Sequence, residues 1–182
     1  MSQEEVVMVV ECDEPEGVFS REVRPLYLDM KKLNELYDKL KEFDVLFNDS
    51  VGNDIEAFVN SFLVEVNGEM QSTGLLWEVD DVGILYITDI RPGYDAYAHF
   101  SFWDRRYRGR EELVRKMIKY VMQKFKFHRI TVDVPLYATP TMGFVERVGF
   151  KHEGRRRKTV KYRGQWFDAN QYAIVEDELD EF

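Results

Sequence analysis

The most chemically suggestive stretch of the sequence is RRYRGREELV, residues 105–114, in which four arginines surround one glycine. Apolar residues recur at helical spacing from Leu113 onward, which predicts an amphipathic helix directly after this turn. Backbone N–H groups and cations at a helix N-terminus bind anions, so the stretch predicts an anion site. Glu111 and Glu112 oppose that interpretation, because carboxylates there would repel a bound anion.

A second basic segment, RRRKTVKYR at 155–163, lies within a chain whose formal net charge is −9. That net charge excludes a general electrostatic nucleic-acid binder. Basic residues interleaved with Tyr162 could contact RNA or DNA, but arginines of a hairpin strand more often pair with neighbouring acids. Nucleic acid is therefore the less favoured partner, and the two basic segments indicate either a local anion pocket or solvated faces.

The composition predicts one folded domain over residues 1–182, with acidic and flexible ends at 1–20 and 176–182. The single cysteine, Cys12, excludes an intramolecular disulfide, and three scattered histidines offer no metal-ligand spacing. No apolar run approaches the ~20 residues of a membrane span. The start of the sequence also lacks a signal-peptide pattern, so we expect a cytoplasmic protein without a metal.

The elements that must position these residues follow from hydrophobic periodicity. The sequence predicts a short strand at 6–10, two helices within 29–43 and 53–62, an antiparallel meander over 62–104, and then a strand–helix–strand–helix–strand–strand order. Thr139 is predicted as the N-cap of the last helix, followed by Pro140, and Gly149 as its C-terminal glycine. The fold class is α/β, in the mixed α+β sense.

The strand expected at 95–104 alternates strictly and carries aromatic residues on both faces, so both faces should be covered. One face holds Ala96, Ala98, Phe100 and Phe102, and the other holds Tyr97, His99, Ser101 and Trp103.

From about residue 96 the chain resembles the GNAT superfamily of N-acetyltransferases, and especially the branch that acetylates the N-termini of ribosomal proteins. The ordered segments YRGREELVRKMIKYVM, FHRITVDV, FVERVGFKHEG and GQWFDANQYAI carry this resemblance. HFSFWDR, before the turn, is similar to a variant found in virus- and phage-encoded members. The resemblance implies a mostly antiparallel sheet of about six to seven strands, about four helices, and a splayed pair formed by the fourth and fifth strands of that fold.

The resemblance also implies acetyl-CoA as co-substrate, with its pyrophosphate on a turn that reads Arg/Gln-x-x-Gly-x-Gly/Ala in the family. Arg106 and Gly109 fit this frame, whereas Glu111 departs from it. Glu111 either turns outward and pairs with Arg108 or Arg115, or the site has lost its ligand. The implied acetyl-CoA contacts are Phe102, Trp103, Asp104, Arg106, Tyr107, Arg108, Gly109, Arg110, Glu111, Thr139 and Thr141.

For catalysis, the resemblance implies that a backbone N–H within 102–104 polarises the thioester carbonyl. A tyrosine that serves many relatives as general acid is replaced by Val145, and an asparagine that contacts the pantetheine arm is replaced by Ala138, where Thr139 or Thr141 could substitute. His99 is the first candidate for the general base, followed by Asp89 and Asp104 at strand ends. A single histidine in a strand is, however, more often a packed and hydrogen-bonded residue.

The sequence thus favours an acetyl-CoA-dependent N-acyltransferase in which a primary amine attacks the thioester directly. The acceptor amine is a protein N-terminus, a lysine or a small amine, and a homo-oligomer stays open. The departures at Glu111, Ala138 and Val145 support one alternative, a non-catalytic GNAT-fold structural or binding protein of a virus or phage. A second alternative, a modifier of nucleic acid, depends only on the basic segment at 155–163.

Overall fold

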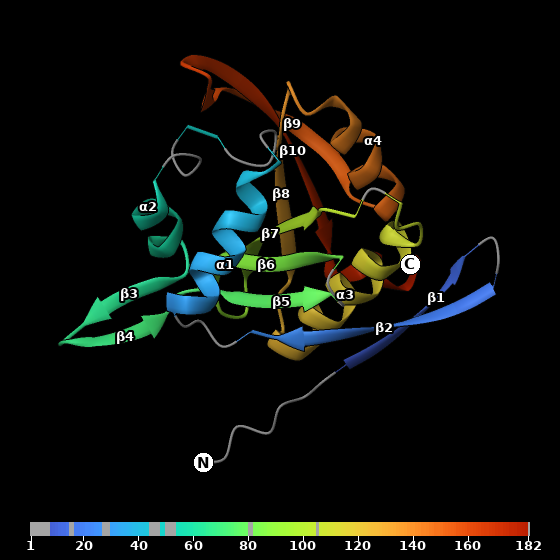
Figure 1. Cartoon of the computed structure of the whole chain (residues 1–182). Coiled ribbons are helices and arrows are strands. Elements are labelled where there is room, and N and C mark those ends of the chain that lie inside the picture. Colours follow the sequence, from blue (N-terminus) through green and yellow to red (C-terminus); the bar gives the residue numbers. More distant parts are fainter. Residues whose placement is uncertain are drawn as a thin grey trace.

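The computed structural model describes residues 8–14, 17–26, 30–43, 48–49, 54–79, 82–104 and 106–181. Its centre is an eight-stranded sheet in the order β1-β2-β5-β6-β7-β8-β10-β9 (Figure 1). These strands are β1 (Met8–Glu14), β2 (Gly17–Pro25), β5 (Leu75–Val79), β6 (Gly83–Arg91), β7 (Asp95–Phe102), β8 (Arg129–Pro135), β9 (Lys151–Tyr162) and β10 (Gln165–Val175). All neighbours pair antiparallel except β7 and β8.

Within the described residues, a separate hairpin and four α-helices accompany this sheet, which agrees with the predicted mixed α/β class. The hairpin is β3 (Leu63–Val66) and β4 (Glu69–Ser72), and the helices are α1 (Met30–Lys41), α2 (Ile55–Asn60), α3 (Arg110–Phe125) and α4 (Thr139–Val148). The hairpin projects from the body of the molecule in Figure 1. In the described part of the chain, no helix has the length and apolar character needed to cross a membrane.

Two apolar layers lie on the two faces of the sheet. On one face, α1 and α2 pack with Leu76 and Ile84 of the sheet. On the other face, α3 and α4 pack with residues such as Leu85, Ile87 and Ala98. Strand β7 is covered on both faces, because Ala96 and Ala98 belong to the α3 layer, while His99 on the other face stacks on Tyr86, which packs against the α1 layer. The predicted double-sided cover of this strand is confirmed.

The N-cap of helix α4 lies one residue earlier than the sequence predicted. Ala138 is the N-cap and Thr139 is already the first helical residue, so the N-cap assignment of Thr139 is wrong. The chain turns early because the Ala138 N–H donates to Pro135 O at 2.9 Å. At the other end Gly149 has φ 115° and its N–H bonds Glu146 O at 3.0 Å, which confirms it as the C-terminal glycine.

The acidic ends carry regular structure where the chain is described. Residues 8–14 and 17–25 form the hairpin β1–β2 on one edge of the sheet, so the main sheet has eight strands, more than the sequence suggested. Residues Glu176–Glu181 form a 3-10 helix whose Leu179 is buried and whose Glu178 accepts the Val175 N–H at 3.0 Å. Three parts of the predicted flexible ends lie outside the described residues, namely 1–7, 15–16 and 182. They include the first two residues of the strand predicted at 6–10.

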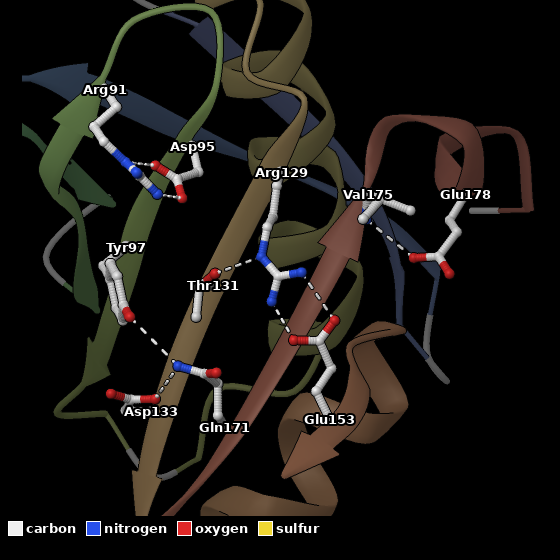
Figure 2. A network of polar contacts seen from close by, with 10 residues as sticks. All are labelled: Arg91, Asp95, Tyr97, Arg129, Thr131, Asp133, Glu153, Gln171, Val175 and Glu178. Atoms are coloured by element: carbon white, nitrogen blue, oxygen red, sulfur yellow. Dashed lines mark hydrogen bonds and ion pairs between the residues drawn. The ribbon is translucent and has the colours of Figure 1, made fainter. Parts of the chain in front are cut away.

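The parallel contact between β7 and β8 is short. Only three residue pairs join the strands, the last being Tyr97 with Thr131, whereas β8 stays paired to β10 as far as Pro135. Figure 2 shows the polar contacts at this junction, where Gln171 on β10 donates to both Tyr97 Oη and Asp133 Oδ1 at 3.3 Å. Beyond this junction β8 follows β10 and separates from β7, which is the predicted splay.

Candidate functional site

A cavity of about 650 Å³ lies where β7 and β8 separate. Strand β7 contributes Ala98, His99, Phe100 and Ser101 to its wall, and β8 contributes Val132, Asp133, Val134 and Pro135. The start of α4 closes one side with Ala138, Thr141 and Val145, and strand β6 adds Tyr86, Thr88 and Asp89. The splayed strands therefore form a mixed polar and apolar chamber of a size suited to a small ligand.

His99 lies in the wall of this cavity with its imidazole held on two sides. Its ring stacks on Tyr86 with a centroid distance of 4.5 Å and an interplanar angle of 6°. Its Nε2 lies 2.9 Å from Thr88 Oγ1. Burial lowers the pKa of His99 from 6.5 to about 4, an effect that the charge of Asp89 partly offsets. The imidazole is consequently neutral at pH 7 and available as a proton acceptor.

Tyr86 is a second titratable ring in this wall, and burial raises its pKa to about 12. Its hydroxyl thus stays protonated at neutral pH. Tyr86 also contacts Phe62 edge-on at a centroid distance of 5.3 Å, which ties it to the α1 and α2 layer. The Tyr86–His99 stack is for this reason a fixed part of the wall.

The charge inside the cavity is negative. Its described lining contains the carboxylates of Asp89 and Asp133 and neither lysine nor arginine. Asp133 is neutralised by an ion pair with Arg156. Its Oδ1 also accepts a hydrogen bond from the side-chain amide of Gln171 (Figure 2). Asp89 instead accepts the Thr88 hydroxyl at 3.3 Å. A cationic group is the natural guest of such a chamber.

The arginine-rich turn leads into the N-terminus of α3, as the sequence predicted. Gly109 is the residue before the helix and has φ 28°, a conformation that favours glycine. The Nε of Arg110 is buried there and meets no hydrogen-bond acceptor among the described residues. The side chains of Arg106 and Arg108 are exposed. Arg105 lies outside the described residues. This end of the helix can accept an anion.

Glu111 turns toward another helix. Its carboxylate accepts from Arg147 Nη2 at 3.0 Å and Nε at 3.1 Å, and Arg147 belongs to the last turn of α4. We expected Arg108 or Arg115 as the partner, and this partner is different because α3 and α4 pack together. Arg115 instead donates to the carbonyl oxygens of Arg147 and Val148 at 2.8 and 3.3 Å. The carboxylate that contradicted the anion site is paired with a cation.

Several predicted residues lie outside the cavity. Asp104 accepts the Arg106 N–H at 2.9 Å and shapes the turn, and the structure does not place it in the lining. The backbone N–H groups of Trp103 and Asp104 donate to Val82 O at 3.1 and 3.3 Å, so they are engaged. Within the lining stretch 98–101 of β7, every second N–H points away from β6, on the side where β8 separates.

The remaining predicted contacts divide between the two ends of the site. Of the two threonines, Thr141 lines the cavity, whereas Thr139 is exposed and its hydroxyl donates to Leu136 O at 3.4 Å. Phe102 packs on Tyr107, which is buried, with a centroid distance of 5.9 Å. Trp103 lies under Lys39 Nζ, 4.2 Å from its ring centroid. Phe102, Trp103 and Tyr107 thus support the turn and do not line the cavity.

Sequence reasoning missed Tyr86 and Thr88 as site residues and gave Ser101 no role. The signal for Ser101 was present, because it shares a strand face with His99. Tyr86 and Thr88 lie on β6, whose register places Tyr86 opposite His99 and Thr88 opposite Tyr97. No periodicity within one strand reveals such a cross-strand pairing.

Comparison with known proteins gives a consistent result. The family described as "Acetyltransferase (GNAT) domain" matches residues 27–171. A probable N-acetyltransferase of Bacillus subtilis, YjcK, is 35% identical over 77 residues, which are 41% of this chain and 42% of that protein. The chain therefore spans less than half the length of this relative.

RimJ and RimL are two of the solved structures that share the fold. RimJ of Mycobacterium smegmatis, in complex with CoA-disulfide, has a TM-score of 0.68 at 18% identity, covering 94% of this chain and 88% of its own. RimL, a ribosomal L7/L12 alpha-N-protein acetyltransferase in complex with coenzyme A, has a TM-score of 0.61 at 14% identity, covering 85% of this chain and 94% of its own.

Proposed function

The chain belongs to the GNAT family of acetyltransferases, and we propose that it transfers the acetyl group of acetyl-CoA to a primary amine. The single observation that carries this proposal is the cavity at the β7–β8 separation, with a neutral imidazole in its wall. The acceptor is an amine of a protein N-terminus, a lysine side chain or a small molecule.

The residues of the turn fit the pyrophosphate of acetyl-CoA. The N-terminus of the sixteen-residue helix α3 directs backbone N–H groups and a partial positive charge toward an anion. The buried Nε of Arg110 lacks an acceptor among the described residues, and a phosphate oxygen would supply one. Gly109 keeps the approach to the backbone open. Arg106 and Arg108 add cations at the surface.

Acetyl-CoA supplies the thioester, and the protein supplies position and proton transfer. Thr141 and the apolar Ala138 and Val145 line the cavity on the α4 side and would flank the pantetheine arm. A backbone N–H within 98–101 would hydrogen-bond the carbonyl oxygen as charge develops on it. His99 would accept a proton from the attacking nitrogen.

The negative lining supports an amine as acceptor. Because Arg156 neutralises Asp133, Asp89 gives the lining its negative charge, and the described lining residues include no lysine or arginine, so an ammonium ion is attracted to the cavity. No cysteine or serine nucleophile is required, because the amine attacks the thioester directly. The basic strand β9 gives no reason to assign nucleic acid, since Arg155 and Arg156 pair with Asp168 and Asp133.

The test has two stages. Calorimetry and thermal unfolding with acetyl-CoA measure binding, for which a hundredfold excess over Kd should stabilise the protein by about 2.7 kcal/mol. Mass spectrometry then follows acetylation of a panel that contains N-terminal peptides, lysine peptides and small diamines. Binding with acetylation of one class is expected.

Each other outcome has a defined meaning. Absence of heat and of a thermal shift at millimolar acetyl-CoA would overturn the proposal. Binding without acetylation of any amine would support the rival interpretation, a non-catalytic GNAT-fold protein. The departures at Ala138 and Val145 motivated that rival, whereas the ion pair of Glu111 with Arg147 weakens it.

A further inference from the structure

We propose that Thr88 and Asp89 are positioning residues that hold His99 in one tautomer, with Nδ1 as the proton acceptor of the site. This inference rests on the proposed acetyltransferase function, in which His99 is the base. It concerns two adjacent residues of β6 that the sequence did not connect with His99. Three side chains form one hydrogen-bonded series, from the carboxylate of Asp89 through the hydroxyl of Thr88 to the imidazole.

The donor and acceptor groups of the three side chains fix the directions of the two hydrogen bonds. The Asp89 carboxylate is only an acceptor when ionised, so the Thr88 hydroxyl must donate its single hydrogen to Asp89 Oδ2, 3.3 Å away. Thr88 Oγ1 then has only lone pairs to offer to His99 Nε2, 2.9 Å away. His99 must accordingly carry its hydrogen on Nε2.

The neutral imidazole has one hydrogen, so Nδ1 keeps its lone pair. Within the residues that the structure describes, Nδ1 takes part in no hydrogen bond, while the ring lines the cavity. The stack on Tyr86 prevents the ring from tilting. The nitrogen with the lone pair is thereby the one left for the substrate.

An unusual backbone conformation makes this series possible. Successive side chains of a strand point to opposite faces, so Thr88 and Asp89 should diverge. Asp89 has φ 49°, and the pairing of β6 with β7 is irregular between Thr88 and Arg91. This bulge brings the Asp89 carboxylate back to the Thr88 hydroxyl. A left-handed residue other than glycine costs energy and is retained where the geometry requires it.

The charges around His99 favour this arrangement over a fixed imidazolium. The titratable groups in the lining are Tyr86 and Asp89 from β6, Asp133 from β8 and Tyr137, which follows β8. Arg156 neutralises Asp133, and burial keeps Tyr86 protonated. Asp89 is therefore the carboxylate that opposes the desolvation of the ring, and it stabilises the imidazolium formed during the reaction.

The acceptor ammonium first loses one proton to solvent, which leaves a neutral amine in the cavity. The nitrogen of this amine forms a bond with the thioester carbon, and the C–S bond breaks as the tetrahedral intermediate collapses. The N–H proton of the attacking nitrogen passes to Nδ1 of His99, whose Nε2–H stays hydrogen-bonded to Thr88. The imidazolium then gives the Nδ1 proton to the leaving CoA thiolate, which returns His99 to its starting tautomer.

The first experiment reads the tautomer without using activity. Protein with 15N-labelled histidine gives long-range 1H–15N correlations that distinguish Nε2–H from Nδ1–H, and the His99→Gln spectrum assigns the His99 signals. At pH 7 the wild-type protein should show the Nε2–H form of His99. Thr88→Val should give a mixture of both forms, and Thr88→Ser should restore the Nε2–H form. A wild-type Nδ1–H form would overturn the proposal even if the enzyme is active.

The second experiment uses the acetylation assay. We expect Thr88→Val and Asp89→Asn to lower kcat about 10- to 100-fold while acetyl-CoA binding stays unchanged. Asp89→Asn should also move the acid limb of kcat/KM to lower pH, because the counter-charge that raises the His99 pKa is gone. Asp38→Asn on the exposed face of α1 removes the same charge at a distance and should change neither quantity.

The two proposals fail in different ways. If Asp89→Asn behaves like Asp38→Asn in both the rate and the pH profile, Asp89 is not a positioning residue. If no variant and no wild-type protein acetylates an amine, the function itself fails, while the tautomer measurement still decides the hydrogen-bond order.

Discussion

The cavity around His99 and the turn at 106–111 use opposite means to bind their ligands. The cavity contains carboxylates, aromatic rings and a neutral imidazole, and its polar side chains are fixed by hydrogen bonds to one another. The turn offers exposed arginines, a glycine with positive φ and the backbone of a helix start. In the cavity side-chain identity decides the chemistry, whereas at the turn backbone shape does.

This difference predicts how each region responds to substitution. A conservative side-chain change should harm the cavity and leave the turn largely unaffected, because one exposed arginine can compensate for another. A change of backbone conformation should do the reverse. The link between the regions is the ion pair of Glu111 with Arg147, which joins the first turn of α3 to the last turn of α4.

The largest effect should come from Gly109→Val, which breaks only the turn. A β-branched residue at φ 28° is strained and places methyl groups on the path to the helix N–H groups. We expect acetyl-CoA binding to weaken at least ~100-fold, or about 2.7 kcal/mol, in calorimetry. Gly68→Val is the matched control, since Gly68 has φ 84° and open space around it in the β3–β4 turn. Equal losses in both variants would contradict a direct role of the turn.

The second prediction tests the cavity through pH. The unfolded imidazole binds a proton below its ordinary pKa of 6.5, but burial lowers the folded pKa of His99 to about 4. The stability that His99 contributes is therefore complete above pH 6.5 and is lost as the pH falls toward 4, by up to about 3 kcal/mol. The free energy of unfolding, measured with urea at several pH values between 7 and 4, should fall less steeply with decreasing pH for His99→Gln than for the wild type. An equal pH dependence in the two proteins would mean that the imidazole is not desolvated.

The third prediction concerns the link. Arg147→Ala leaves Glu111 without its cation beside the anion site, and acetyl-CoA binding should weaken about 3- to 10-fold. Glu111→Gln alone should change binding less than about 3-fold, and the double variant should recover wild-type binding within the same margin. A tenfold gain from Glu111→Gln alone would show that Arg147 does not neutralise Glu111.

The smallest effect is expected at Trp166, which belongs to neither region. Its side chain is 56% exposed on β10 and is not part of the cavity lining. Trp166→Ala should change the free energy of unfolding and the acetyl-CoA affinity by less than about 0.5 kcal/mol each. A loss of acetylation rate for a bulky acceptor would instead place Trp166 on the acceptor's path.

The sequence predicted the turn better than the cavity, for a physical reason. The glycine, the arginines and the apolar stripe of α3 are local signals, and a helix start needs little else. The series from Asp89 to His99 depends on a bulge and on the register of two strands, and Thr88 and His99 are eleven positions apart in the sequence. The partner of Glu111 is 36 residues away on another helix, so periodicity could not choose Arg147 over Arg115.

The three residue pairs that join β7 to β8 also divide the sheet into two blocks, β1-β2-β5-β6-β7 and β8-β10-β9. Backbone amides exchange with deuterium through openings of the units to which they belong. We expect the two blocks to exchange as separate cooperative units, with slow exchange within β8, whose pairing with β10 continues beyond the separation. The separation of β7 from β8 that makes room for a substrate is thus also a boundary between two units of the sheet. We expect the sheet to open at this boundary before the whole protein unfolds.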